Sequence, residues 1–131
     1  MAVFVDTGAW YAASVPSDLD HVVASAFLRS NADPLVISDF IFDELLTLFR
    51  FRGQMDRAQD WVAQIRRRRL EVVTVTKADI QKATDVFFGF ADKEWSFTDC
   101  TSRVVMERLG IQRAFAFDDH FRQFGTVTVV P

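Results

Sequence analysis

The chain has 131 residues and a formal net charge of −3, and half of its residues are hydrophobic. Domains commonly contain ~150 residues, so the length predicts one domain that spans residues 1–131. The hydrophobic content excludes a disordered chain, the single cysteine excludes internal disulfides, and the acidic balance argues against coating nucleic acid through bulk charge.

Neither a membrane span nor a signal peptide is expected. Asp or Arg interrupts every apolar stretch before the roughly 18 residues that a span needs. The first strand-like segment meets Asp6 at once and has no basic flank, unlike a signal peptide. The lone thiol of Cys100 fits a reducing compartment, so the sequence predicts a cytoplasmic protein.

Strands and helices are expected to alternate along the chain. Short, wholly apolar runs predict buried strands at Ala2–Val5, Leu35–Ile37, Val72–Val75, Ala114–Phe117 and Thr126–Val130. Helical spacing and capping residues predict helices at Leu19–Ser30, from Ser38 or Asp39 to about Arg52, at Asp56–Arg69, from Lys77 to about Phe88, and from a Thr98 cap to an end just before Gly110. Strands without polar alternation need both faces covered, which predicts a parallel sheet between helix layers.

Three acidic residues are expected at one edge of this sheet. Asp6 follows the first strand, Asp118 follows the fourth, and Asp99 lies in the first turn of the last helix. Open parallel sheets bind ligands beyond the carboxyl ends of their strands. Each residue also has a simpler interpretation, as a turn residue for Asp6 and Asp118 or as a favourable charge at a helix N-terminus for Asp99. Their coincidence at one edge favours a functional site.

Glu44 is singled out by helical geometry. At ~100° per residue, it lies outside the polar face of its helix and among apolar side chains. A carboxylate there needs a compensating cation or must reach solvent. Carboxylates that converge without His or Cys suit Mg²⁺ or Mn²⁺ rather than Zn²⁺.

Four segments, in this order, resemble the motifs of PIN-domain proteins, and most closely those of VapC-type toxins from toxin–antitoxin pairs. These segments are Val3–Thr7, the helix that contains Ser38 and Glu44-Leu45, Ser96–Cys100 and Ala116–Phe121. The resemblance covers nearly the whole chain. It implies a three-layer α/β/α sandwich with a mainly parallel sheet of about five strands, and a metal-dependent endoribonuclease.

The resemblance also implies the site residues of that endoribonuclease. Its catalytic acids would be Asp6, Glu44, Asp99 and Asp118, with the hydroxyls of Thr7 and Thr98 in support. Asp6, Asp99 and Asp118 would hold Mg²⁺ or Mn²⁺, directly or through water. The family pattern Asp-x-His-Phe selects Asp118 over its neighbour Asp119.

Partners are expected from both the composition and the resemblance. Binding of RNA at an acidic site requires basic residues nearby. The candidates are Arg50, Arg52, Arg66 and Arg67, the last two within the run Arg66–Arg69. A run of charged residues on a helix is, however, more often simply a solvent-exposed face.

Fourteen phenylalanines present more apolar surface than a small core readily buries, which favours a surface for a protein partner. The resemblance implies a cognate antitoxin and a homodimer.

Two other functions are open to such a fold. One is a catalytically silent PIN-like module that only binds proteins, for which intact acids would be unnecessary. The other is a phosphoryl-transfer domain of the receiver or phosphatase type. Such a domain would carry paired acids after the first strand, whereas Asp6-Thr7-Gly8 offers a single one.

Overall fold

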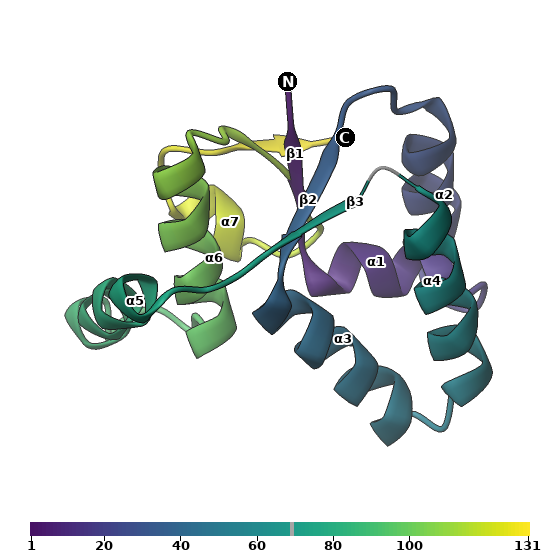
Figure 1. The fold of residues 1–131 in the computed structure, drawn as a ribbon, viewed down its shortest axis with the longest axis horizontal. Helices are drawn as coiled ribbons and strands as arrows, with labels where there is room; N and C mark the ends of the chain where they lie inside the picture. Colours follow the sequence, from purple (N-terminus) through teal and green to yellow (C-terminus); the bar gives the residue numbers. More distant parts are fainter. Residues whose placement is uncertain (69) are drawn as a thin grey trace.

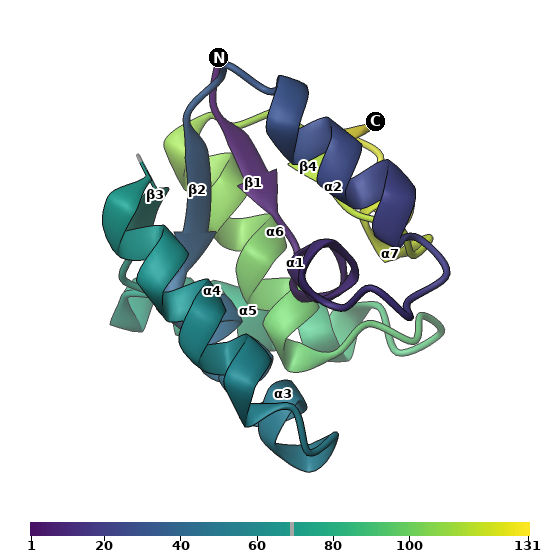
Figure 2. The ribbon, with the colours of Figure 1, turned by 90° about the vertical axis from the view of Figure 1, so that its right-hand side faces the viewer.

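Five parallel strands form a sheet between two layers of helices in the computed structural model, which describes residues 1–68 and 70–131. The elements in chain order are β1 (Val3–Val5), α1 (Thr7–Ser14), α2 (His21–Ser30), β2 (Leu35–Ser38), α3 (Asp39–Phe51), α4 (Met55–Arg67), β3 (Leu70–Val73), α5 (Lys77–Gly89), α6 (Phe97–Leu109), β4 (Arg113–Phe115), α7 (His120–Gln123) and β5 (Thr128–Val130). Helices α5 and α6 cover one face, and α1, α2 and α4 cover the other (Figures 1 and 2). The predicted three-layer α/β/α architecture is confirmed.

The order of the strands places β1 at the centre of the sheet. The order is β3-β2-β1-β4-β5, and every neighbouring pair is parallel. Strands β1 and β2 are buried along their whole length, as expected for apolar strands that are covered on both faces. The segments after β1 and β4 therefore leave the same edge of the sheet side by side, and the backbone N–H of Asp6 donates to the carbonyl of Phe115 at 3.0 Å.

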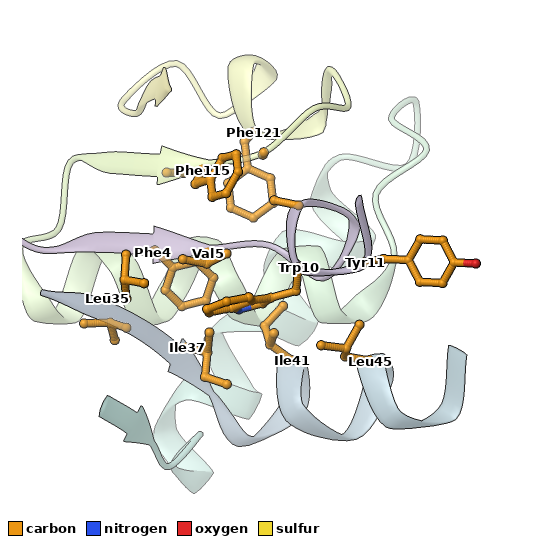
Figure 3. Close-up of a cluster of buried hydrophobic side chains, with 14 of the residues drawn as sticks. Phe4, Val5, Trp10, Tyr11, Leu35, Ile37, Ile41, Leu45, Phe115 and Phe121 are labelled. Carbon is orange, nitrogen blue, oxygen red and sulfur yellow. The ribbon is translucent and has the colours of Figure 1, made fainter. Parts of the chain in front are cut away.

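The core fills the space between the sheet and the helices (Figure 3). Trp10 of α1 meets Trp61 of α4 edge to face, with ring centroids 5.6 Å apart. Ile41 and Leu45 of α3 are fully buried and lie beside Trp10 in the same cluster. Burial of these large side chains anchors α1 and α3, the helices that follow β1 and β2 at the carboxyl edge of the sheet.

The sequence reasoning missed helix α1. The prediction treated Asp6-Thr7-Gly8 as the end of a strand, whereas a helix begins at Thr7. Most of this helix is buried, from Ala9 to Ala12, so it has no polar face and gives no amphipathic pattern. Tertiary burial stabilises it despite the low helix propensity of Gly8.

Several predicted boundaries were also wrong. Helix α6 is capped by Ser96 instead of Thr98, because the Ser96 side chain accepts the N–H of Asp99 in a capping box. Helix α2 begins at His21 instead of Leu19, and β3 ends at Val73 instead of Val75. The remaining strands differ by one or two residues at their ends, and a short helix that was not predicted, α7, begins at His120. The predicted helix end at Arg69 lies outside the described residues.

In the part of the chain that the structure describes, no helix is both long enough and apolar enough to cross a membrane. The longest helices have 13 residues.

Arg108, near the C-terminus of α6, ties this helix to the N-terminus of α5. Its guanidinium donates to the carboxylate of Asp79 from Nε at 3.0 Å and from Nη2 at 2.9 Å, and Nη2 also donates to the carbonyl of Thr74. Asp79 is buried and forms the α5 capping box with Thr76. Burial opposes ionisation of Asp79, but the hydrogen bonds from Arg108 and Thr76 outweigh it and lower its pKa.

An Arg108→Ala variant should lose about 1–3 kcal/mol of unfolding free energy at pH 7, because the buried carboxylate keeps its desolvation cost and loses its strongest donor. Partial exposure of Arg108 favours the lower half of this range. Since the folded state lowers the pKa of Asp79, the stabilisation by the Arg108–Asp79 pair is present above the ordinary value of 3.8 and is lost as the pH falls.

Urea denaturation at pH 7 and pH 3 measures both the loss of stability and its pH dependence. The control is Arg122→Ala, which removes an exposed pair with Asp119. Equal stability of the two variants at pH 7 would contradict the prediction.

Candidate active site

Asp6 is a buried carboxylate at the centre of the carboxyl edge. It occupies the N-cap position of α1, yet its side chain makes no capping hydrogen bond, and it is 4% exposed. Burial is the main cause that raises its pKa well above the ordinary value, followed by the negative charges of Asp118 and Asp99 and, more weakly, of Glu44. The backbone N–H of Thr7 only partly opposes this increase. The other three predicted acids therefore all lie close enough to act electrostatically on Asp6.

Asp99 is held rigidly in the first turn of α6. Its Oδ2 accepts the backbone N–H of Ser96 at 3.0 Å and forms a second hydrogen bond to Nδ1 of His120 at 2.8 Å. Burial raises the pKa of Asp99; the hydrogen bonds to Ser96 and His120 lower it, and the charge of Asp118 raises it. Two hydrogen bonds to one oxygen fix the orientation of the carboxylate, as a site that holds an ion requires.

Asp118 follows β4 and is exposed at the same edge. Its Oδ1 accepts the backbone N–H of His120 at 3.0 Å, and its Oδ2 lies 3.9 Å from Nδ1 of that residue. The side chain of Asp119 is 83% exposed and pairs with Arg122 at 3.7 Å. The structure therefore places Asp118, rather than Asp119, with the other acids.

Glu44 reaches this edge from α3. The hydroxyl of Thr7 donates to its Oε1 at 2.6 Å, and the side chain is half-buried. This hydrogen bond compensates part of the cost of placing a carboxylate on an apolar helix face. The hydroxyl of Thr98, in contrast, has no hydrogen bond to any of the four acids within residues 1–68 and 70–131. The backbone carbonyl of Thr98 accepts a hydrogen bond from the hydroxyl of Thr101.

His120 and Ser96 were not predicted as site residues, although both bond to Asp99. A signal for Ser96 was present, because Ser-x-x-Asp before an apolar run is a capping-box pattern. The contact of His120 depends on how α7 packs against α6, which local sequence does not specify.

The donor set is suited to a hard, hydrated cation. It consists of carboxylate oxygens with one imidazole beside them, a chemistry that Mg²⁺ and Mn²⁺ accept. Over the described residues, no three His, Cys, Asp or Glu side chains lie close enough together to ligate one ion directly. Mg²⁺ is commonly bound through one or two carboxylates, with waters and substrate phosphates completing its coordination. The residues thus fit an ion held by a few direct contacts, the other acids acting through water.

The predicted basic residues lie in different places. Arg50 and Arg66 border a hollow of about 470 Å³ between α3 and α4, together with apolar side chains and with none of the four acids. Arg67 is exposed on α4. Arg52 borders another hollow, which also includes Asp118. Among these arginines, the structure brings Arg52 to the acidic edge, and Arg69 falls outside the described residues.

This chain belongs to the PIN domain family, whose model matches residues 3–127. It is 34% identical to the 23S rRNA-specific endonuclease VapC20 of Mycobacterium tuberculosis, over 98% of both chains. It is 24% identical to ribonuclease VapC26 of the same organism, over 98% of this chain and all of the other. The predicted VapC-type PIN family is therefore confirmed.

Solved structures agree with this assignment. The crystal structure of M. tuberculosis VapC20, described as a sarcin–ricin loop cleaving toxin, superposes with a TM-score of 0.89 at 32% identity, covering 98% of this chain and 99% of the other. VapBC2 from Rickettsia felis, bound to a DNA fragment from its promoter, gives a TM-score of 0.72 at 12% identity, covering 99% and 98%. The second likeness concerns the fold alone.

Proposed function

We propose that this chain is a metal-dependent endoribonuclease and the toxin of a toxin–antitoxin pair. The observation that carries the proposal is the convergence of Asp6, Glu44, Asp99 and Asp118, from four separate elements, on the carboxyl edge of the sheet. The names of VapC20 and VapC26 agree with the ribonuclease predicted from the sequence. A silent binding module would have no use for a self-repelling set of carboxylates, two of which, Asp6 and Asp99, are buried.

The proposed substrate is 23S rRNA at its sarcin–ricin loop. Support comes from VapC20, which is similar to this chain over 98% of both sequences and is described as cleaving that loop. The proposed mechanism is hydrolysis of one phosphodiester bond.

The four acidic residues would have different roles in hydrolysis. A bound Mg²⁺ or Mn²⁺ would supply a water of lowered pKa and would offset the charge of the phosphate. Asp6 and Asp99 would hold the ion, and Asp118, which is open to solvent, would complete its surroundings through water. Glu44, fixed by Thr7, would accept a proton from the attacking water or orient it.

The proposed partners are an antitoxin, a second copy of the chain and RNA. The apolar hollow between α3 and α4, which Leu46, Met55 and Val62 line between Arg50 and Arg66, could receive an antitoxin helix. Exposed phenylalanines on α5, such as Phe88 at 72%, offer apolar surface for contact between copies. The chain is proposed to be one cytoplasmic domain of residues 1–131, in keeping with its buried, unpaired Cys100.

The substrate proposal can be tested on intact bacterial ribosomes. Purified protein with Mg²⁺ should produce one dominant break in 23S rRNA, within the sarcin–ricin loop, that primer extension maps to a single bond. A synthetic stem–loop of the same sequence should be cut at the same bond, and an Asp99→Asn variant should cut neither. Cleavage dispersed over the rRNA would contradict the proposed target, and no cleavage at all would contradict the ribonuclease.

A further inference from the structure

Beside the acidic edge lies a hollow that none of the four proposed catalytic roles uses. It has a volume of about 400 Å³, within the ~300–1,000 Å³ of ordinary ligand pockets. Asp118 and Gly8 form the side that it shares with the acids, and Leu48 and Phe117 supply apolar wall. We propose that this hollow binds the base of a nucleotide next to the cleaved bond, and guanine above all. The inference rests on the proposed ribonuclease function.

Arg52 supplies the positive charge in the lining of this hollow. Its guanidinium carbon lies over the ring of Tyr11, 5.0 Å from the centroid. The hydroxyl of Tyr11 donates to Oε1 of Gln54 at 2.7 Å, and its buried ring packs against Phe49 with centroids 5.7 Å apart, so the ring that supports Arg52 is fixed. Arg52 is exposed and forms no ion pair within residues 1–68 and 70–131. Proteins stack unpaired bases on exposed guanidinium planes of this kind.

The charges in the hollow favour a base over a phosphate. Three carboxylates, those of Asp18, Asp20 and Asp118, face a single guanidinium, that of Arg52. The local charge is therefore negative, and a phosphate placed in the hollow would be repelled. A nucleobase is neutral and carries hydrogen-bond donors, so it suits both the apolar wall and the carboxylates.

The side chain of Asp20 has no hydrogen-bond or ion-pair partner among residues 1–68 and 70–131. It occupies the N-cap position of α2, but its side chain makes no capping hydrogen bond. The loop around it is fixed, because Oδ1 of Asp18 accepts the backbone N–H of Asp20 at 2.9 Å. An ionised carboxylate offers two acceptor oxygens and no donor. Guanine presents its ring N–H and its 2-amino group side by side, which matches those two oxygens, whereas the edge of uracil is dominated by carbonyl acceptors.

The position of the hollow connects it to the reaction. Asp118 belongs both to the acidic edge and to the hollow, and Gly8 follows the catalytic Asp6 by two residues. An RNA strand whose phosphate lies on the acids would thus bring a neighbouring base to Arg52. Base recognition there would select which bond is cut.

Nucleoside binding tests this inference without any cleavage. Guanosine, inosine, adenosine, cytidine and uridine are titrated against the full-length protein in EDTA, by saturation-transfer NMR. Guanosine should bind tightest, and inosine, which lacks the 2-amino group, should bind about tenfold more weakly, as expected for a hydrogen bond to a charged acceptor. Arg52→Ala should weaken guanosine binding about tenfold through lost stacking. Asp20→Asn should bind guanosine and inosine equally.

Two exposed residues outside the hollow provide matched controls. Arg122→Ala and Asp43→Asn remove the same kinds of charge and should leave nucleoside binding unchanged. Indifference of the wild type to the identity of the base, or unchanged guanosine binding in Arg52→Ala, would overturn the inference even if RNA is cleaved. Guanosine binding that depends on Arg52 in a protein that cleaves no RNA would support the base site and refute the ribonuclease.

Discussion

An Asp6→Asn variant should cleave RNA roughly 10²–10⁴-fold more slowly than the wild type, yet it should unfold at the same or a higher temperature without metal. The loss of activity follows because Asp6 is proposed to hold the ion. The gain in stability follows because burial and three neighbouring acids already disfavour its charged form. Asparagine has almost the same shape and carries no charge, so it relieves this repulsion.

Initial rates of RNA cleavage with Mg²⁺, and thermal unfolding in EDTA, measure these opposite effects on one preparation of each variant. The matched control is Asp43→Asn, an exposed acid of α3, which should change neither quantity appreciably. A purely structural Asp6 would behave differently, since its substitution would lower the unfolding temperature and would reduce cleavage only as far as it unfolded the protein. That result would contradict the assignment of Asp6 to the site.

Divalent metal should stabilise the wild type strongly, and more at high pH than at low pH. The folded state raises the pKa of Asp6 and of Asp99 above 3.8, so the folded protein binds more protons than the unfolded chain between the two values. Stability without metal must therefore fall as the pH rises through this range. A bound cation removes the repulsion, so the fall should disappear when the metal saturates the site.

Thermal unfolding from pH 4 to pH 8, with EDTA or with Mg²⁺, measures this effect. At a metal concentration ~100 times the Kd, the unfolding temperature should rise by roughly 5–10 °C at pH 8. The rise should be small at pH 4 and small at every pH in Asp6→Asn. An unfolding temperature that is the same with and without Mg²⁺ and Mn²⁺ at pH 8 would show that these acids hold no ion.

The sheet was predictable because its strands leave a strong local signal. Runs such as Leu35–Ile37 are apolar on both faces, and only a covered parallel sheet accommodates them. The predicted positions of the acids followed from the same rule, since Asp6 directly follows β1 and Asp118 comes shortly after the end of the neighbouring strand β4. Glu44 was predicted from its misfit on an apolar helix face, and the structure gives the reason, a hydrogen bond from Thr7.

What the sequence could not show depends on packing between distant elements. Helix α1 is buried by α2, α3 and the sheet, so its residues carry no periodic pattern that would reveal it. The hydrogen bond between His120 and Asp99 joins residues 21 positions apart, and the hollow at Arg52 combines residues from α1, α3 and three loops. The prediction treated the arginines alike, and only their placement in the fold separates Arg52 from Arg50 and Arg66.

Cleavage of RNA by the purified protein, with Mn²⁺ or with EDTA, tests most directly whether these four carboxylates form a metal-dependent ribonuclease site. The account predicts that intact bacterial ribosomes incubated with the wild type release a defined 23S rRNA fragment in Mn²⁺. It also predicts none in EDTA, and none from Asp6→Asn or Asp99→Asn under either condition. Equal cleavage in Mn²⁺ and EDTA, or undiminished cleavage by both variants, would contradict it.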